Sequence, residues 1–274
     1  MPQTLAEIKA LLDARGLSPR KRFGQNFLID HNLVRKLVDE SGVAAGDLVL
    51  EVGPGTGTLT EELLERGCEV VACELDRGLA ELLRERLGHH AGFSLIEGDC
   101  LAHKREVSAE IVGALGGDRA RRFTLVANLP YGAATPLMLA LLTAHPACCG
   151  MYVTIQKEVG QRLAARAGQS AYGGISVVAQ TLATVRIIAK LPPECFWPRP
   201  EITSVMVAVE HRDDHGISDP AAFGGFCQRV FAQRRKQLGS VLGRALAWPE
   251  GIEPRMRAEG LTPEQIVALW RAVG

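Results

Sequence analysis

The chain has 274 residues, of which 47% are hydrophobic and 23% charged, and its 31 basic and 31 acidic side chains leave no net charge. This composition is typical of a globular protein with a substantial core, and the neutral balance excludes a uniformly basic surface for nucleic acid. No apolar run approaches the roughly 20 residues of a membrane-spanning helix. The 7 cysteines form no Cys-x-x-Cys pair, so we expect reduced thiols, no metal site and a cytoplasmic protein.

The first 16 residues, MPQTLAEIKALLDARG, contain two acidic residues and no apolar stretch of the kind found in secretory signals. Leu5, Ile8, Leu11 and Leu12 fall on one face of a helix. We therefore expect a small helix that docks on the rest of the protein.

Between Asp47 and Gln156, short apolar runs alternate with helical patterns such as Leu59–Arg66 and Gly78–Leu87. This alternation predicts an α/β fold with a doubly wound, parallel Rossmann-like sheet. The expected strands are Leu48–Val52, Val70–Glu74, Ser94–Glu97, Thr124–Ala127 and Met151–Ile155.

Two further strand-like runs follow, at Val185–Ala189 and Val205–Val209, and then a polar linker, EHRDDHGISDP. From Ala221 to Gly274 only helical patterns remain. We predict two domains: residues 1–210, of which the first 46 form an N-terminal helical segment, and a small helical domain at 211–274.

The stretch VLEVGPGTGTLT places Gly53, Gly55 and Gly57 between the first expected strand and a helix. Glycines there let backbone N–H groups approach a ligand, although a plain strand-to-helix turn has the same pattern. Thr58 stands where the dinucleotide fingerprint needs Gly or Ala, so the loop favours a ligand other than NAD.

Acidic residues end the next two expected strands. Glu74 lies about 20 residues after the loop, where it could accept hydrogen bonds from a ribose, and Asp99 could accept an adenine amino group. Either alone could be a surface carboxylate. Because parallel strands end at one edge of the sheet, the three strand ends together predict a ligand site.

The fourth strand runs into VANLPYGAA, residues 126–134. Proline cannot continue a strand ladder, so Pro130 predicts that the strand ends and that an exposed loop follows. An amide from Asn128 and a ring from Tyr131 could hold a flat group with a polar edge.

These strand ends resemble the class I S-adenosylmethionine-dependent methyltransferases, and Asn128-Leu129-Pro130-Tyr131 resembles the form found in rRNA adenine N6-dimethyltransferases. The resemblance covers nearly the whole chain and, at its C-terminal end, favours the ribosome-biogenesis branch, the KsgA (RsmA) branch, over the erythromycin-resistance methylases. The stretches that carry it are RKRFGQNFLID, QKEVGQRLAA, AYGGISVVAQ, LPPECFWPRPEITSV, FAQRRKQL and RAEGLTPEQIVAL.

The resemblance implies transfer of two methyl groups from S-adenosyl-L-methionine to N6 of each of two adjacent adenines near the 3′ end of small-subunit (16S) rRNA. The expected partner is a small ribosomal subunit precursor with its rRNA, bound by a monomer and without a membrane. The implied cofactor residues are Asn26, Leu28, Gly53, Gly55, Glu74, Asp99 and Asn128, and the implied catalytic residues are Asn128, Leu129, Pro130, Tyr131 and Phe196.

Within that implied site, the Asn128 side-chain oxygen and the Leu129 carbonyl are expected to hold the hydrogens of N6, with Tyr131 and Phe196 as aromatic faces for the base. Core packing is the alternative for Phe196. Clustered cations are expected to contact RNA at Arg20, Lys21, Arg22 and at Arg234, Arg235, Lys236, and a third cluster is Arg119, Arg121 and Arg122. Each could instead be a solvated face.

Two other functions are compatible with this sequence. One is an adenine methyltransferase that acts on large-subunit rRNA or DNA, and the other is a catalytically retired ribosome-assembly or transcription factor on the same fold. The intact set Gly53, Glu74, Asp99 and Asn128 argues against retirement.

Overall fold

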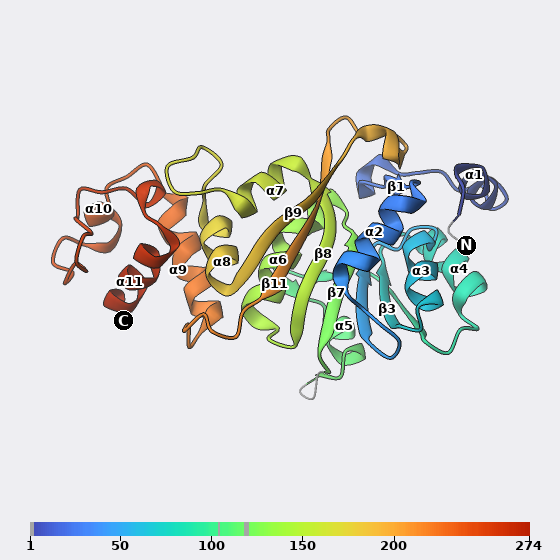
Figure 1. Cartoon of the computed structure of the whole chain (residues 1–274), viewed down its shortest axis with the longest axis horizontal. Helices are drawn as coiled ribbons and strands as arrows, with labels where there is room; N and C mark the ends of the chain where they lie inside the picture. The colour runs from blue at the N-terminus through green and yellow to red at the C-terminus, as the bar shows by residue number, and fades with distance from the viewer. Residues whose placement is uncertain (1–2, 104, 118–120) are drawn as a thin grey trace.

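The computed structural model describes residues 3–103, 105–117 and 121–274. A seven-stranded sheet in the order β4-β3-β2-β7-β8-β11-β9 runs through the molecule (Figure 1). Its strands are β2 (Leu48–Val52), β3 (Glu69–Glu74), β4 (Phe93–Glu97), β7 (Phe123–Asn128), β8 (Cys148–Gln156), β9 (Ala183–Leu191) and β11 (Ser204–His211).

The five strands from β4 to β8 are parallel, which confirms the predicted doubly wound sheet. β11 inserts between β8 and β9 and is antiparallel to both of them. The apolar pattern of β11 predicted a strand but not this direction, since a buried strand has the same pattern in either orientation.

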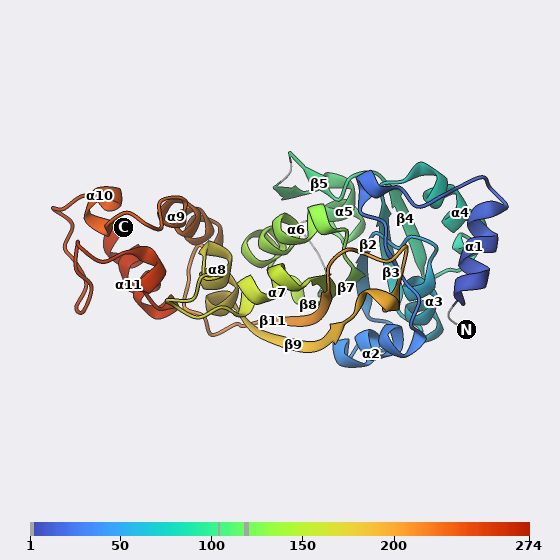
Figure 2. The ribbon, with the colours of Figure 1, turned by 90° about the horizontal axis from the view of Figure 1, so that it is seen from above.

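Helices cover both faces of the sheet (Figure 2). Alternate residues of β2 show why: Leu48 and Leu50 join the apolar cluster on one face, and Val49 joins the cluster on the other. All of β2 is buried, as expected for a parallel strand covered on both sides. The helices are α1 (Leu5–Asp13), α2 (His31–Ser41), α3 (Thr58–Glu65), α4 (Arg77–Leu87), α5 (Ala109–Ala114), α6 (Tyr131–Ala144), α7 (Lys157–Ala164), α8 (Gly174–Leu182), α9 (Pro220–Ala232), α10 (Leu238–Leu242) and α11 (Pro263–Val273).

Helix α1 is the small docking helix that the sequence predicted. Thr4 and Glu7 form a capping box at its start, and Ile8 and Leu12 are fully buried against Phe27 and Leu79. Phe27 belongs to β1 (Phe27–Leu28), which pairs with β10 (Phe196–Trp197) beside the glycine loop. A second short pair joins β5 (Leu101–Ala102) to β6 (Glu106–Val107). Single turns of 3-10 helix are η1 (Lys21–Phe23), η3 (Pro193–Cys195) and η4 (Ala258–Gly260).

Beyond β11 the chain is helical, and α9 and α11 pack against α8 (Figure 1). The Tyr172 hydroxyl donates to the Leu261 carbonyl at 2.8 Å, and the rings of Phe223 and Trp270 meet edge to face. The apolar cluster around α6 and α8 continues into α9 and α11 without a break. Over the residues that the model describes, every helix is too short or too polar to cross a bilayer.

Candidate active site

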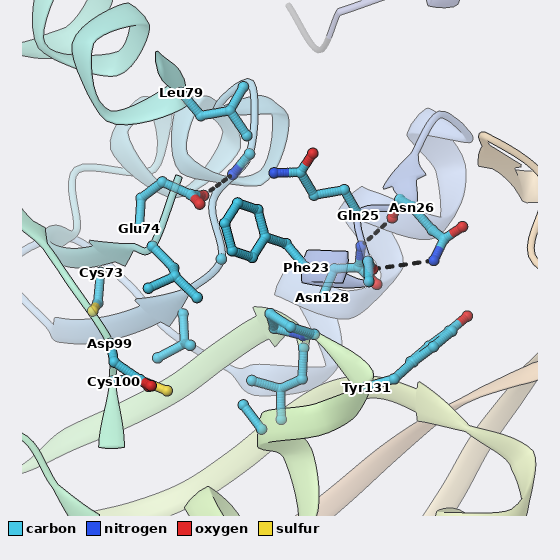
Figure 3. A pocket seen from close by; sticks show the side chains of 18 of the residues that line it. Phe23, Gln25, Asn26, Cys73, Glu74, Leu79, Asp99, Cys100, Asn128 and Tyr131 are labelled. Carbon is cyan, nitrogen blue, oxygen red and sulfur yellow. Dashed lines mark hydrogen bonds between the residues drawn. The ribbon is translucent and has the colours of Figure 1, made fainter. Parts of the chain in front are cut away.

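A cavity opens at the carboxyl ends of β2, β3, β4 and β7 (Figure 3). Open parallel sheets bind ligands at the carboxyl ends of their strands, because the loops that follow the strands converge there. Nine of the residues predicted from the sequence line it: Asn26, Gly53, Gly55, Glu74, Asp99, Asn128, Leu129, Pro130 and Tyr131.

The glycine loop has backbone angles that favour glycine, with φ of 74° at Gly53 and 62° at Gly55. A Cβ at Gly53 would lie 2.9 Å from Pro130 Cγ, and one at Gly55 would lie 2.7 Å from the Phe27 ring. These glycines are therefore required by close packing of the loop on Pro130 and Phe27. The close approach of a ligand to the backbone N–H groups of this loop, which the sequence suggested, stays a prediction.

Glu74 ends β3 and is only 5% exposed. Its carboxylate accepts a hydrogen bond from the Gly55 N–H at 3.1 Å and one from the Asp76 N–H at 2.9 Å. Burial raises the pKa of Glu74 to about 7, and these N–H donors oppose the shift. The same carboxylate thus fixes the glycine loop and faces the cavity.

Asp99 is exposed at the rim of the cavity, and its Oδ1 accepts a hydrogen bond from the Leu101 N–H at 3.0 Å. Leu75, which the sequence analysis did not single out, also lines the cavity and is 48% exposed. Its position directly after the acid that ends a predicted strand is the signal in the sequence that could have identified it.

Asn128 is the last residue of β7, and its amide is held on two sides. Nδ2 donates to the Asn26 carbonyl at 2.8 Å, and the Thr154 hydroxyl donates to Oδ1.

The exposed loop expected after Asn128 is wrong, because Leu129 is 2% exposed and α6 already begins at Tyr131. Pro130 stands at the N-cap position, directly before the helix, where a backbone N–H would have no partner within the helix. The Tyr131 hydroxyl lies 3.2 Å from Ser204 Oγ.

Two predicted residues do not line this cavity. Phe196 is 3% exposed and packs with Leu28 in the apolar cluster on the α2 side of the sheet. Leu28 borders a separate small cavity behind the glycine loop, together with Glu51 and Thr58. Phe196 is therefore placed as a core residue in this structure, and its contact with a base stays a prediction.

The sequence analysis also missed Phe23, although it lies inside the RKRFGQNFLID signature. Its ring projects from η1 into the cavity between Glu74 and Asn128 (Figure 3). The cavity volume is only about 90 Å³, whereas sites for ligands of drug size span roughly 300–1,000 Å³. The Phe23 ring therefore occupies part of the space that a cofactor would need.

The lining of the cavity fits S-adenosylmethionine. The described residues that line it include no lysine, arginine or histidine, so its charged side chains favour a ligand that carries positive charge. Glu74 and Asp99 instead offer carboxylates, which suit a ribose diol, an amino group and a sulfonium. The described residues also contain no cluster of three or more His, Cys, Asp or Glu that could hold a metal ion.

In the predicted cationic clusters, some side chains have partners within the protein and others are exposed. Arg20 pairs with Asp76 at 3.3 Å, while Lys21 and Arg22 are exposed. Arg234 donates to the carbonyls of Ser170 and Tyr172, at 3.1 and 3.2 Å. Arg235 and Lys236 are exposed. In the third cluster Arg121 pairs with Glu69, Arg122 donates to Cys149, and Arg119 lies outside the described residues.

The sheet order with one antiparallel strand, the glycine loop after β2, and the acids at the ends of the next two strands agree with a class I S-adenosylmethionine-dependent methyltransferase, the class of the family that matches the chain. The family model for ribosomal RNA adenine dimethylases matches residues 16–273. The chain belongs to this family, whose members are S-adenosylmethionine-dependent methyltransferases.

Individual relatives match over nearly the whole chain. A ribosomal RNA small subunit methyltransferase A from Magnetococcus marinus is 41% identical over 96% of this chain and 94% of its own length. A protein of the same name from Moorella thermoacetica is 37% identical, over 96% of each chain. The crystal structure of a dimethyladenosine transferase from Plasmodium falciparum shares the fold with a TM-score of 0.70 at 20% identity, over 88% of this chain and 94% of that one.

Proposed function

We propose that this protein transfers methyl groups from S-adenosylmethionine to N6 of two adjacent adenines near the 3′ end of small-subunit (16S) rRNA, two to each base. The main support is that the glycine loop, Glu74, Asp99 and the Asn128–Tyr131 segment line one cavity. The names of the relatives, which specify the small ribosomal subunit, favour this rRNA over that of the large subunit.

S-adenosylmethionine supplies an activated methyl group on sulfur when it is bound. We assign Glu74 to its ribose and Asp99 with Leu75 to its adenine, because all three line the cavity and Glu74 and Asp99 lie on the same side of it (Figure 3). Backbone groups of Gly53 and Gly55, together with Asn26, hold the amino-acid part. Leu28 supports them from behind the loop.

The remaining side chains act on the target base. The N6 lone pair of adenine is delocalised into the ring, so the nitrogen is a poor nucleophile. Oδ1 of Asn128 and the Leu129 carbonyl accept its hydrogens and favour a pyramidal nitrogen, while Tyr131 stacks on the base, which has left its neighbours. Most of the rate enhancement then comes from alignment. Phe196 provides a second aromatic face after leaving its buried position.

RNA binding involves cations that the fold leaves exposed. Lys21 and Arg22 follow Arg20 beside the cavity, and Arg235 and Lys236 follow Arg234 at the end of α9. We propose residues 1–210 as the methyltransferase domain and 211–274 as the RNA-contact domain of a cytoplasmic monomer that acts on a small-subunit precursor.

The test is methyl transfer from radiolabelled cofactor to four acceptors: immature small subunits, mature small subunits, large subunits and DNA. We expect label only in immature small subunits, at two adjacent adenines when the RNA is mapped. Label in large subunits or DNA would establish the other methyltransferase function. Binding to small subunits without label would establish a retired assembly factor.

A further inference from the structure

We propose that Thr154 is a positioning residue that fixes the orientation of the Asn128 amide for methyl transfer. The inference rests on the proposed function, because it concerns the acceptor that holds N6. Thr154 lies on β8, directly opposite Asn128 in the parallel register, and it does not line the cavity. It therefore acts on the reaction only through Asn128.

The hydrogen bonds leave one orientation for this amide. The Asn26 backbone oxygen can only accept, so the group that faces it at 2.8 Å is the Asn128 NH2. Oδ1 consequently faces Thr154, and the hydroxyl of Thr154 is the donor. The Asn26 carbonyl thus selects the orientation in which Nδ2 of Asn128 faces it, and the Thr154 hydroxyl holds Oδ1 on the opposite side.

The surroundings make this hydrogen bond a strong constraint. Thr154 is 1% exposed, so water does not compete for its hydroxyl. The Leu129 N–H also donates to the Thr154 carbonyl at 3.1 Å, which fixes the backbone at the start of the Asn128–Tyr131 segment. A carbonyl oxygen has two lone pairs. With one used by Thr154, the other is held in a defined direction for a hydrogen of N6.

A pair of variants separates the hydroxyl from the shape of the side chain. Thr154→Val keeps the branched shape and removes the donor, whereas Thr154→Ser keeps the donor. We expect Thr154→Val to lower the single-turnover rate about 10-fold, the equivalent of one hydrogen bond, with cofactor affinity and particle binding within about twofold. Thr154→Ser should stay near the wild-type rate. Should Thr154→Val fail to fold, Thr154→Ala removes the same donor and is compared with Thr154→Ser.

A double-mutant cycle with Asn128→Ala tests whether Thr154 acts through the amide. Once Asn128 is alanine, Thr154→Val should cause no further loss of rate. A wild-type rate in Thr154→Val, or an equal loss with and without Asn128, overturns the proposal. The wild-type enzyme decides the proposed function separately: if it methylates a different acceptor, that function fails, and the same cycle is measured on the acceptor that it does methylate.

Discussion

Substitutions at Asn128 and Tyr131 should lower the rate of methyl transfer more than they lower binding affinity. Asn128→Ala removes an acceptor that matters most as N6 becomes pyramidal, and such a loss lowers turnover more than affinity. We expect a single-turnover rate at least about 100-fold lower, as for one preorganised polar group. Tyr131→Ala should also slow transfer, since base stacking contributes roughly 1–3 kcal/mol, with cofactor affinity nearly unchanged.

Tyr131→Phe is the matched control for Tyr131→Ala. It keeps the ring and removes only the hydroxyl, which contacts Ser204, so we expect a mild loss. Rates are followed on undermethylated small subunits, and particle binding is followed separately. Near-normal rates in both alanine variants would show that this segment is only a connection between β7 and α6.

The buried carboxyl group of Glu51 leads to a prediction about how the free energy of unfolding depends on pH. It is 1% exposed, and burial raises its pKa from 4.5 to about 8, although the Thr60 hydroxyl donates to it at 2.7 Å. The folded protein thus keeps a proton that the unfolded chain releases near pH 4.5. Between these pKa values the unfolded state binds fewer protons, so stability falls as pH rises, by roughly 1.4 kcal/mol per unit.

Glu51→Gln keeps a polar side chain of the same size and cannot ionise. We expect its advantage over the wild type in free energy of unfolding to be small near pH 5 and to grow up to about pH 8. Urea unfolding at pH 5.5 and 8.5 measures this, with Glu106→Gln on the surface as control. The same pH slope in wild type and Glu51→Gln would contradict it.

At the scale of elements, we expect the segment around η1 to limit access to the cofactor site. Gln25 and Arg20 tie this segment to Asp76, and the ring of Phe23 stands in the cavity. We expect cofactor binding to shift this segment, at a cost that lowers the apparent affinity. We expect Phe23→Ala to bind S-adenosylhomocysteine several-fold more tightly in calorimetric titration, while Lys21→Ala, which is exposed, leaves the affinity unchanged. Weaker binding by Phe23→Ala would mean that the ring packs on the bound cofactor instead.

Local patterns predicted the elements that carry the site. Buried parallel strands produce continuous apolar runs, so β2, β3 and β4 were predicted to within a residue of their ends. Glu74 at the end of β3 and Asp99 just after β4 followed from these predictions. The missed features depend on contacts between distant segments. Thr154 meets Asn128, and Phe23 enters the cavity, only after folding. Phe196 could not be assigned to core or cavity because an aromatic residue suits either.

At the scale of the whole molecule, two exposed cationic pairs flank the enzyme. Lys21 and Arg22 follow α1, and Arg235 and Lys236 follow α9, and these helices lie toward opposite ends of the long axis (Figure 1). A bound particle that contacts both pairs must cover the cavity edge and the C-terminal helices together. Because the chain carries no net charge, we expect attraction to RNA to be local to these two pairs.

The C-terminal cluster should divide into a structural residue and two RNA contacts. Arg234 holds the loop at Ser170 and Tyr172, so Arg234→Ala should lower the unfolding midpoint and leave the salt dependence of particle binding unchanged. The double variant Arg235→Ala with Lys236→Ala should leave the unfolding midpoint unchanged and weaken the salt dependence of particle binding. Each lost phosphate contact reduces the slope of log affinity against log salt by roughly 0.7–0.9, so we expect the double variant to flatten it by up to about 1.8. Binding measured between 50 and about 200 mM salt gives these slopes. If the double variant keeps the wild-type slope, Arg235 and Lys236 are only solvated side chains and the RNA contact lies elsewhere on the helical domain.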